Sequence, residues 1–248
     1  MKVFVDANIY KLSVVARRVY RPEVQRAKWG DFEDDMVSYY SSYDYPISGV
    51  NNDKMREDAA ALLFVCEAAK QSIVKFIASS ELQLEVLGLP KLDSTTGKLF
   101  GAKAEWCPAP VEYSRVMINW RQGRKLMQHK FLKSIDDGRF HELQKATGAF
   151  QGANKELNRN QLLDAFHIWC AEFNYCDFFL SVDYKLARSL QNSSVKTLRV
   201  VTPKEMLKEI YKSVGFWRSI GFTVKSLAAL NRLERNTSEP WGLNFKQH

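Results

Sequence analysis

The chain has 248 residues, a formal net charge of +8 and a sequence pI of about 9.2. This length is enough for a real hydrophobic core, in one large domain or in one domain with additions. The charge favours an anionic partner, nucleic acid first and a membrane surface second, although an ordinary basic protein has the same charge. No stretch approaches the length of a transmembrane helix, and the first apolar run, residues 3–5, is too short for a signal peptide.

The four cysteines indicate a reducing compartment. Cys66, Cys107, Cys170 and Cys176 form neither a CxxC pair nor a zinc spacing with the sparse histidines. We therefore expect free thiols in a cytoplasmic protein without a membrane segment.

The N-terminal region begins with a buried strand over residues 3–5, which ends at Asp6. The spacing of apolar residues then predicts a helix over residues 9–20, with Asn8 at its start. From residue 21 to residue 54 the periodicity is lost, and the segment is rich in Tyr, Asp, Ser and Gly. An irregular insertion of this length is either a functional loop or a tolerated addition.

The next segment is predicted to form a helix over residues 55–71 and a strand over residues 72–78. Ser79 and Ser80 can cap a short helix over residues 81–87, which carries Glu81 and Glu85 on one face. The helix dipole explains an acid in the first turn, such as Glu81, but explains Glu85 less well.

Residues 88–120 form a second irregular segment, and a basic helix is predicted over residues 121–132. Its basic residues make either a solvated face or a face that contacts phosphates; the candidates for RNA binding are Arg121, Arg124, Lys125 and Lys130. We expect residues 136–149 to continue as a helix that Gly138 breaks.

The central stretch is predicted to be a helix over residues 158–173, capped by Asn158 or Asn160, and then a strand over residues 178–182. Asp164 lies among mostly apolar neighbours on this helix, and Asp183 closes the strand. Buried carboxylates are costly, so such acids usually gather around a cation, a basic partner or water.

The C-terminal part is predicted to contain a helix over residues 184–190, a strand over residues 197–201 and a helix opened by Thr202 and Pro203. The alternation of strands and helices predicts an α/β domain with a parallel sheet and helices on both faces. The carboxyl ends of parallel strands share one edge, so Asp6 and Asp183 could meet there. Residues 213–248 form a basic, aromatic and helical extension.

Four sequence blocks in this order resemble the PIN-domain family of metal-dependent ribonucleases: VFVDANIY from Val3, FIASSELQLEV from Phe76, LLDAFHIWCAEFNYCDFFLSVDYKL from Leu162 and LRVVTPKEML from Leu198. The family's pattern is a strand ending in Asp, a Ser-led helix with Glu, a helix opening with Asp-Ala and a strand closing with Thr/Ser-x-Asp. The resemblance covers residues 1–212 and implies a three-layer α/β/α fold with a central parallel sheet. The two irregular segments and the C-terminal extension depart from the compact toxin members.

The resemblance also implies a site. By position, the catalytic and metal-binding acids are Asp6, Glu85, Asp164 and Asp183, and the supporting residues are Asn8 and Ser181. Glu81 competes with Glu85 for its place. His167, three residues after Asp164, is expected to be a packed or hydrogen-bonded helix residue and not a metal ligand.

The chemistry of these residues agrees with the resemblance. Carboxylates repel a phosphodiester, but they can hold Mg²⁺ or Mn²⁺, which prefer oxygen ligands. Structural zinc prefers Cys and His, so an all-carboxylate site suits a nuclease better than a zinc centre.

We therefore expect a Mg²⁺- or Mn²⁺-dependent endoribonuclease, in the role of a toxin or of an RNA-processing or defence enzyme. Its expected partner is RNA, and an antitoxin, another protein partner or a homodimer is compatible with the sequence. One alternative is a PIN-like module that binds RNA or protein without cutting. Another is a different α/β phosphate enzyme, either a phosphatase or a structure-specific DNA nuclease.

Overall fold

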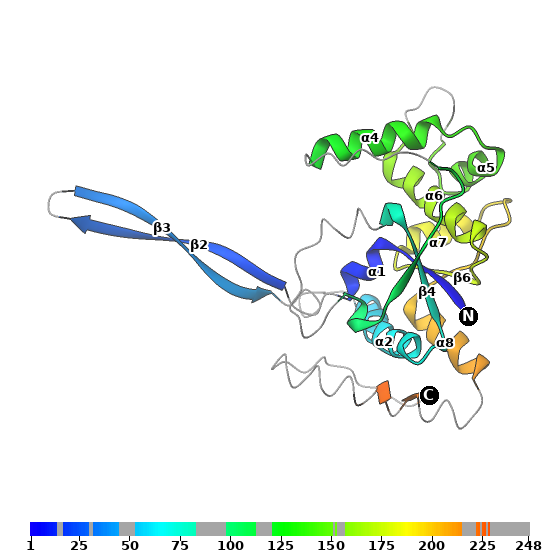
Figure 1. Ribbon diagram of the computed structural model, residues 1–248, viewed down its shortest axis with the longest axis horizontal. Coiled ribbons are helices and arrows are strands. Elements are labelled where there is room, and N and C mark those ends of the chain that lie inside the picture. Colours follow the sequence, from blue (N-terminus) through cyan, green and yellow to red (C-terminus); the bar gives the residue numbers. More distant parts are fainter. Residues whose placement is uncertain are drawn as a thin grey trace.

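The computed structural model describes residues 1–13, 17–29, 32–44, 53–82, 98–112, 121–150, 152 and 157–214, and a few residues between 222 and 228. A five-stranded, all-parallel sheet in the order β5-β4-β1-β6-β7 lies at the centre of the body (Figure 1). Its strands are β1 (Lys2–Val5), β4 (Lys75–Ser79), β5 (Ala104–Cys107), β6 (Phe178–Leu180) and β7 (Val200–Val201).

Helices cover both faces of this sheet. One apolar cluster joins the sheet to α1 (Ala7–Leu12), α2 (Asp53–Lys70), the 3₁₀ helix η1 (Lys98–Gly101) and α8 (Pro203–Ser213). The other cluster joins it to α4 (Arg121–Ser134), α5 (Gly138–Ala146), α6 (Arg159–Phe173) and α7 (Tyr184–Gln191). The expectation of an α/β fold with a central parallel sheet is therefore confirmed, and its layers are consistent with an α/β/α sandwich.

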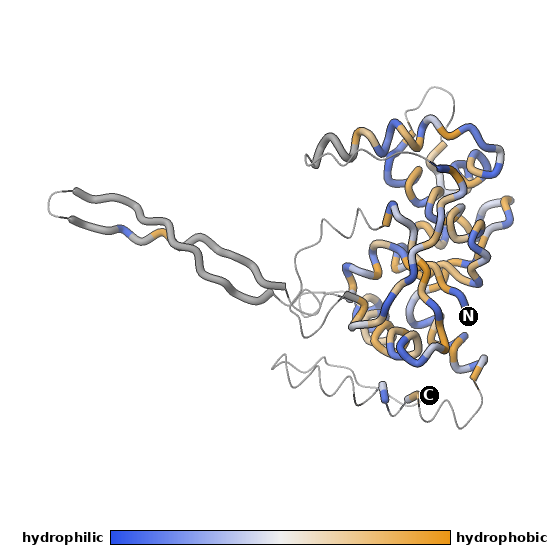
Figure 2. Tube along the Cα trace, in the orientation of Figure 1, coloured by the Kyte–Doolittle hydropathy of each residue, from blue (hydrophilic) through white to orange (hydrophobic). Residues whose placement is uncertain are grey.

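The central strand β1 shows how the sequence builds two cores at once. Val3 and Val5 are buried in the cluster with α2 and α8, whereas Phe4 is buried in the cluster with α6. Successive residues of a strand lie on opposite faces, so a continuous apolar run is what a strand covered on both sides requires. Phe4 stacks on Phe179 of β6 with ring centroids 5.4 Å apart. Figure 2 shows the apolar residues concentrated in the interior, where strands and helices meet.

Several local predictions are confirmed at helix ends. Asn158 caps α6, since its side chain accepts hydrogen bonds from the backbone N–H groups of Asn160 and Gln161. Thr202 and Glu205 form a reciprocal capping box at the start of α8, with Pro203 as its first residue. The described helices at α2, α4 and α7 lie within a few residues of their predicted bounds.

The prediction for residues 9–54 is wrong in two respects. The helix expected over residues 9–20 ends at Leu12, and the segment expected to be irregular from residue 21 to residue 54 is largely a hairpin. β2 (Arg17–Trp29) pairs antiparallel with β3 (Phe32–Asp44) along its whole length. The hairpin is not part of the central sheet. Its sequence lacks the alternation of apolar and polar residues that identifies a half-buried strand.

Two further expectations need correction. The segment expected to be irregular over residues 88–120 contains η1 and the edge strand β5, a short strand in which no residue is fully buried. Gly138 does not break a helix but begins α5, because the carboxylate of Asp137 caps this helix by accepting a hydrogen bond from the backbone N–H of Phe140 at 2.9 Å.

The expected C-terminal extension, residues 213–248, lies mostly outside the described residues. Phe222 is an exception: it is fully buried, with its ring centroid 6.4 Å from that of Phe64 in α2 and 5.7 Å from that of Tyr211 in α8. This part of the extension therefore packs on the domain that precedes it. All four cysteines are free, and no described helix is long and apolar enough to cross a membrane.

The Phe4–Phe179 stack gives a test of the core. Phe179 is 1 % exposed and Phe173 is 50 % exposed. Phe179→Ala should destabilise the protein by about 3–5 kcal/mol, through lost burial and the cavity left behind. For a chain of this size that lowers the melting temperature by roughly 6–20 °C. Thermal melting should show only a small change for the control variant Phe173→Ala; equal losses would mean that Phe179 is not a core residue.

Candidate functional site

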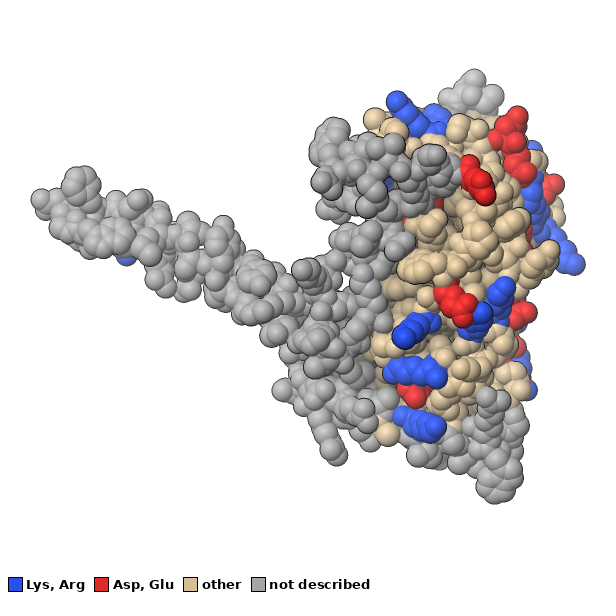
Figure 3. Space-filling model, in the orientation of Figure 1, with Lys and Arg blue, Asp and Glu red and all other residues tan. Residues whose placement is uncertain are grey.

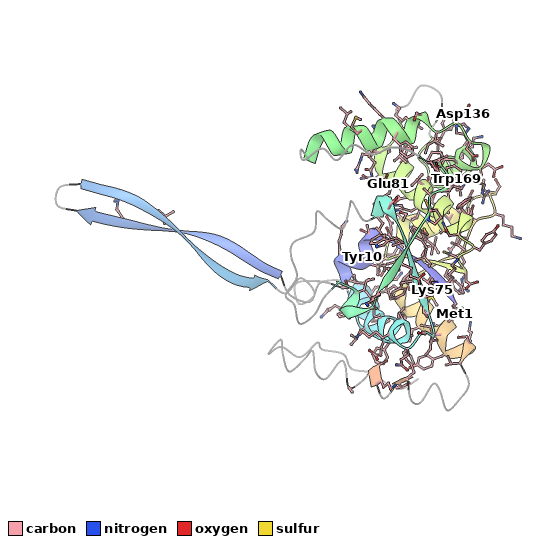
Figure 4. All side chains as sticks on the ribbon, in the orientation of Figure 1. Met1, Tyr10, Lys75, Glu81, Asp136 and Trp169 are labelled. Carbon is pink, nitrogen blue, oxygen red and sulfur yellow. The ribbon has the colours of Figure 1, made fainter. Side chains whose placement is uncertain are left out.

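The three inner strands of the sheet end in the same way on the face covered by α6. Ile77, Phe4 and Phe179 lie in the core on that face, and two residues further along each strand stands a polar residue: Ser79, Asp6 or Ser181. Because alternate residues of a strand share a face, these polar residues line the carboxyl edge of the sheet above the core. Figure 4 marks the two edges, with Lys75 and Glu81 at opposite ends of β4.

Asp6 is the buried centre of this edge. It is 5 % exposed, and its Oδ2 accepts hydrogen bonds from Ser181 Oγ at 2.6 Å and from Asn8 Nδ2 at 3.2 Å. Its backbone N–H donates to the carbonyl oxygen of Leu180 at 3.0 Å, which continues the pairing of β1 with β6. The sequence placed Asp6, Asn8 and Ser181 in one site, and they are in direct contact.

Asp183 is connected to Asp6 through the side chain of Ser181. The hydroxyl of Ser181 donates to Asp6 and accepts from the backbone N–H of Asp183 at 3.0 Å. Asp183 begins α7 as its N-cap, and its Oδ1 accepts from the N–H groups of Lys185 and Leu186 at 2.9 and 3.0 Å. Its Oδ2 has no hydrogen-bond partner among the described residues.

The electrostatics of Asp6 follow from this packing. Burial raises the pKa of the Asp6 carboxyl, and the negative charge of Asp183 raises it further. The hydrogen bond from Ser181, the N–H of Ala7 and the charge of Lys11 act in the opposite direction, but the pKa stays above its ordinary value. Two acids whose charges oppose each other at one sheet edge are the arrangement that a bound cation would relieve.

Asp164 lies in the second turn of α6. This helix ends near the amino edge, where Lys2 Nζ donates to the carbonyl of Asn174, so its first turns lie at the carboxyl edge. His167 packs beside Phe4, with ring centroids 6.0 Å apart. His167 lies three residues after Asp164, so Asp164 is nearer to the start of α6.

Within the described part of the chain, no group of three or more His, Cys, Asp or Glu side chains is close enough to hold a metal ion. The fourth expected acid, Glu85, lies outside the described residues. The structure therefore brings Asp6 and Asp183 together through Ser181 and leaves the complete quartet as a prediction.

Glu81, the competitor for Glu85, is 1 % exposed at the end of β4. Its Oε2 accepts a hydrogen bond from Gln128 Nε2 of α4 at 2.7 Å, and Gln128 Oε1 in turn accepts from Arg159 Nη2 at the start of α6. Glu81 therefore ties three elements together at the carboxyl edge. No sequence pattern indicated Gln128 and Arg159 in this role, because both are distant from Glu81 along the chain.

His167 is a packed residue of α6, as expected. It is 1 % exposed, burial lowers its pKa to about 3, and its Nε2 has no hydrogen-bond partner among the described residues. The ring is therefore neutral at ordinary pH.

The basic helix is present as α4, and Lys130 on it is exposed. The side chains of the other RNA-binding candidates, Arg121, Arg124 and Lys125, lie outside the described residues. On the face drawn in Figure 3, the described Lys and Arg side chains lie among Asp and Glu side chains and form no continuous basic surface there.

The chain matches no protein-family model, and no curated protein or solved structure is significantly similar to it. The resemblance to PIN domains thus stands on the four sequence blocks.

The raised pKa of Asp6 leads to a prediction about stability without metal. Between the ordinary value of 3.8 and the raised value, the folded state binds more protons at Asp6 than the unfolded state does. The free energy of unfolding therefore falls as the pH rises through this window, and the penalty is fully present above it. Asp6→Asn removes the charge, so in EDTA at pH 7 its melting temperature should equal or exceed that of the parent. The difference in melting temperature between Asp6→Asn and the parent should shrink below pH 4.

Asp177→Asn is the matched control, because Asp177 accepts the backbone N–H of Lys2 at 2.7 Å at the amino edge of the same two strands. The melting temperature of Asp177→Asn in EDTA at pH 7 should not exceed that of the parent. An Asp6→Asn protein that melts well below the parent in EDTA would contradict the account of Asp6 as a destabilised buried charge.

Proposed function

We propose that this chain is a Mg²⁺- or Mn²⁺-dependent endoribonuclease with a PIN-like fold. The observation that supports it best is the pair Asp6 and Asp183, joined by the hydroxyl of Ser181 at the carboxyl ends of two adjacent central strands. This is the place in an open α/β sheet where ligands bind. The four blocks that resemble PIN domains put catalytic acids at the same positions.

The residues fit a hard divalent cation. Every candidate donor is an oxygen: the carboxylates of Asp6 and Asp183, and beyond them Asp164 and Glu85. Mg²⁺ commonly uses one or two carboxylates and fills its remaining positions with water and substrate phosphate, so a complete protein cage is not required. The mutual repulsion of Asp6 and Asp183, which contributes to the raised pKa of Asp6, would be relieved by such a cation.

In this function the chain's own residues hold and orient the acids. Ser181 and Asn8 fix one oxygen of Asp6, and the N-terminal turn of α7 fixes Oδ1 of Asp183. A bound divalent ion would supply neutralisation of the phosphate charge and a lower pKa for water. Outer partners such as Ser181 matter because they set the orientation and basicity of the ligating oxygens.

RNA as the substrate follows from the PIN resemblance and from the net charge of +8. A toxin role, with an antitoxin as partner, and a role in RNA processing or defence both remain compatible with this chemistry, as do a homodimer and a cytoplasmic location. A module that binds RNA without cutting would carry the same fold but give no metal-dependent products.

Cleavage of a mixed RNA pool with Mn²⁺ tests the activity. The parent should give products that EDTA abolishes. Asp6→Asn and Asp183→Asn should each lose most of the activity, and Ser181→Ala should lose roughly 10- to 100-fold as the residue that orients the acid. Asp177→Asn, on the same strands at the opposite edge, should cut like the parent. RNA that is bound but never cut by the parent, or full activity in Asp6→Asn, would reject the proposal.

Thermal melting tests the metal site without activity. At about ten times its dissociation constant, Mn²⁺ adds roughly RT ln 11, about 1.4 kcal/mol, to the free energy of unfolding. For a chain of this size this raises the melting temperature by roughly 3–6 °C relative to EDTA at equal ionic strength. Asp6→Asn should lose most of this gain, whereas Asp177→Asn should keep it. A parent that gains nothing from Mn²⁺ would mean that these acids do not form a metal site.

A further inference from the structure

A second polar network lies beside Asp183, and the candidate site as described does not include it. Its centre is Asp58 of α2, whose side chain is 1 % exposed. The Oδ2 of Asp58 accepts a hydrogen bond from the hydroxyl of Tyr184, and its Oδ1 accepts one from the backbone N–H of Lys204 at 3.1 Å. Among the described residues, both of its hydrogen-bond donors are therefore neutral groups. Burying a carboxylate is costly, and an apolar contact at such a place is often at least as stable, so stability alone does not account for Asp58.

The two donors to Asp58 belong to the starts of two helices. Tyr184 is the first residue of α7, and Lys204 lies in the first turn of α8. These helices follow β6 and β7, which pair with each other. First-turn N–H groups have no partner within their own helix, and the start of a helix favours a negative charge. Asp58 thus ties both helix starts to α2, which itself packs against α8 (Figure 1).

The ring of Tyr184 is held at its face as well as at its hydroxyl. Lys54 precedes Asp58 by one turn on the same face of α2, and its Nζ lies 3.8 Å from the centroid of the Tyr184 ring. The side chain of Lys204 is engaged elsewhere, since its Nζ donates to Glu57 at 2.7 Å. The orientation of Tyr184 is therefore set by two residues of α2.

The backbone connects this network to the candidate site. Asp183 directly precedes Tyr184 and caps α7, with its Oδ1 bonded to backbone N–H groups in the first turn of that helix. On its other side, the backbone N–H of Asp183 donates to the hydroxyl of Ser181. The position of the Asp183 carboxylate thus depends on the first turn of α7, which Asp58 holds through Tyr184.

We propose that Tyr184 and Asp58 are positioning residues for Asp183. Asp58 fixes the hydroxyl of Tyr184, Tyr184 fixes the first turn of α7, and this turn fixes the carboxylate that faces the metal. Outer partners of this kind set the orientation of ligating oxygens, and their loss typically costs about 10- to 100-fold in metal affinity or activity. The inference rests on the proposed function and adds two residues that act through Asp183, and not on the metal or the RNA directly.

Removing one hydroxyl tests the positioning role. Tyr184→Phe keeps the ring but removes the donor to Asp58. The dissociation constant of Mn²⁺, measured on the full chain from the electron paramagnetic resonance signal of free Mn²⁺, should rise roughly 10- to 100-fold relative to the parent. Cleavage of RNA should require correspondingly more Mn²⁺ for half of the maximal rate.

Tyr211→Phe is the matched control. Tyr211 of α8 also uses its hydroxyl in one side-chain hydrogen bond, at 2.9 Å from Oγ1 of Thr223, but this bond joins α8 to the C-terminal segment and not to α7. Tyr211→Phe should therefore bind Mn²⁺ with the dissociation constant of the parent.

A double variant separates positioning from stability. Tyr184→Phe leaves Asp58 as a buried charge with one donor fewer, so the melting temperature in EDTA should fall. Adding Asp58→Asn removes that charge and should restore much of the lost melting temperature. The double variant should still bind Mn²⁺ as weakly as Tyr184→Phe does, because the link from α2 to α7 is still missing.

The outcomes separate this inference from the proposed function. If the parent binds Mn²⁺ and Tyr184→Phe binds it equally well, the positioning role is overturned while the metal site stands. If the double variant regains Mn²⁺ affinity together with its melting temperature, Asp58 and Tyr184 only stabilise the fold, and the inference is again overturned. A parent that binds no Mn²⁺ rejects the proposed metal site and the inference with it.

Discussion

The hydrogen bond from Ser181 to Asp6 is the interaction on which the rest of the site depends. A carboxylate at the end of the central strand is buried between two apolar cores, where an unpartnered charge is costly. Ser181 partly offsets that cost at 2.6 Å, and the same hydroxyl accepts the backbone N–H of Asp183. The hydroxyl therefore links the carboxylate of Asp6 to the backbone of Asp183, an acid whose charge raises the pKa of Asp6. A protein with no use for this charge would be more stable with an apolar residue in its place, which is why a buried acid here points to a ligand.

The parallel sheet explains why polar residues gather at one edge and not at both. At the amino edge the backbone N–H of Lys2 donates to the side chain of Asp177, and the backbone N–H of Asp177 donates to the carbonyl of Lys2. The Nζ of Lys2 donates to the carbonyl of Asn174, so these polar groups bond to one another. At the carboxyl edge the chain turns from strands into helices, whose first turns present N–H groups. Asp183 caps α7 there, and Ser79 accepts from Leu82. The buried Glu81, linked through Gln128 to Arg159, holds α4 and α6 over this edge. The described carboxyl edge thus holds Asp6, Asp183 and the buried Glu81, with α4 and α6 joined to it through Gln128 and Arg159.

In the proposed function, the acids at the carboxyl edge serve the chemistry and not the attraction of RNA. A site made of carboxylates repels RNA until a cation is bound, so the attraction must come from elsewhere on the molecule. On the face drawn in Figure 3, the described Lys and Arg side chains lie among Asp and Glu side chains, so the view shows no single basic surface there.

The sequence by itself determined those elements whose structure follows from residues within the element or directly beside it. Val3, Phe4 and Val5 are apolar on both faces because both are covered, and Asn158 and Thr202 cap helices through bonds to their own neighbours. The positions of Asp6, Ser181 and Asp183 at strand ends were predictable for the same reason, since the carboxyl ends of parallel strands meet wherever the chain places them. Only the tertiary structure decided that Glu81 is tied to Gln128 and Arg159, that β5 completes the sheet as a short edge, and that residues 17–44 form a hairpin. The bonds of Glu81 and the pairing of β5 depend on partners distant in sequence, and the sequence of the hairpin has no alternation of apolar and polar residues by which its strands could be recognised.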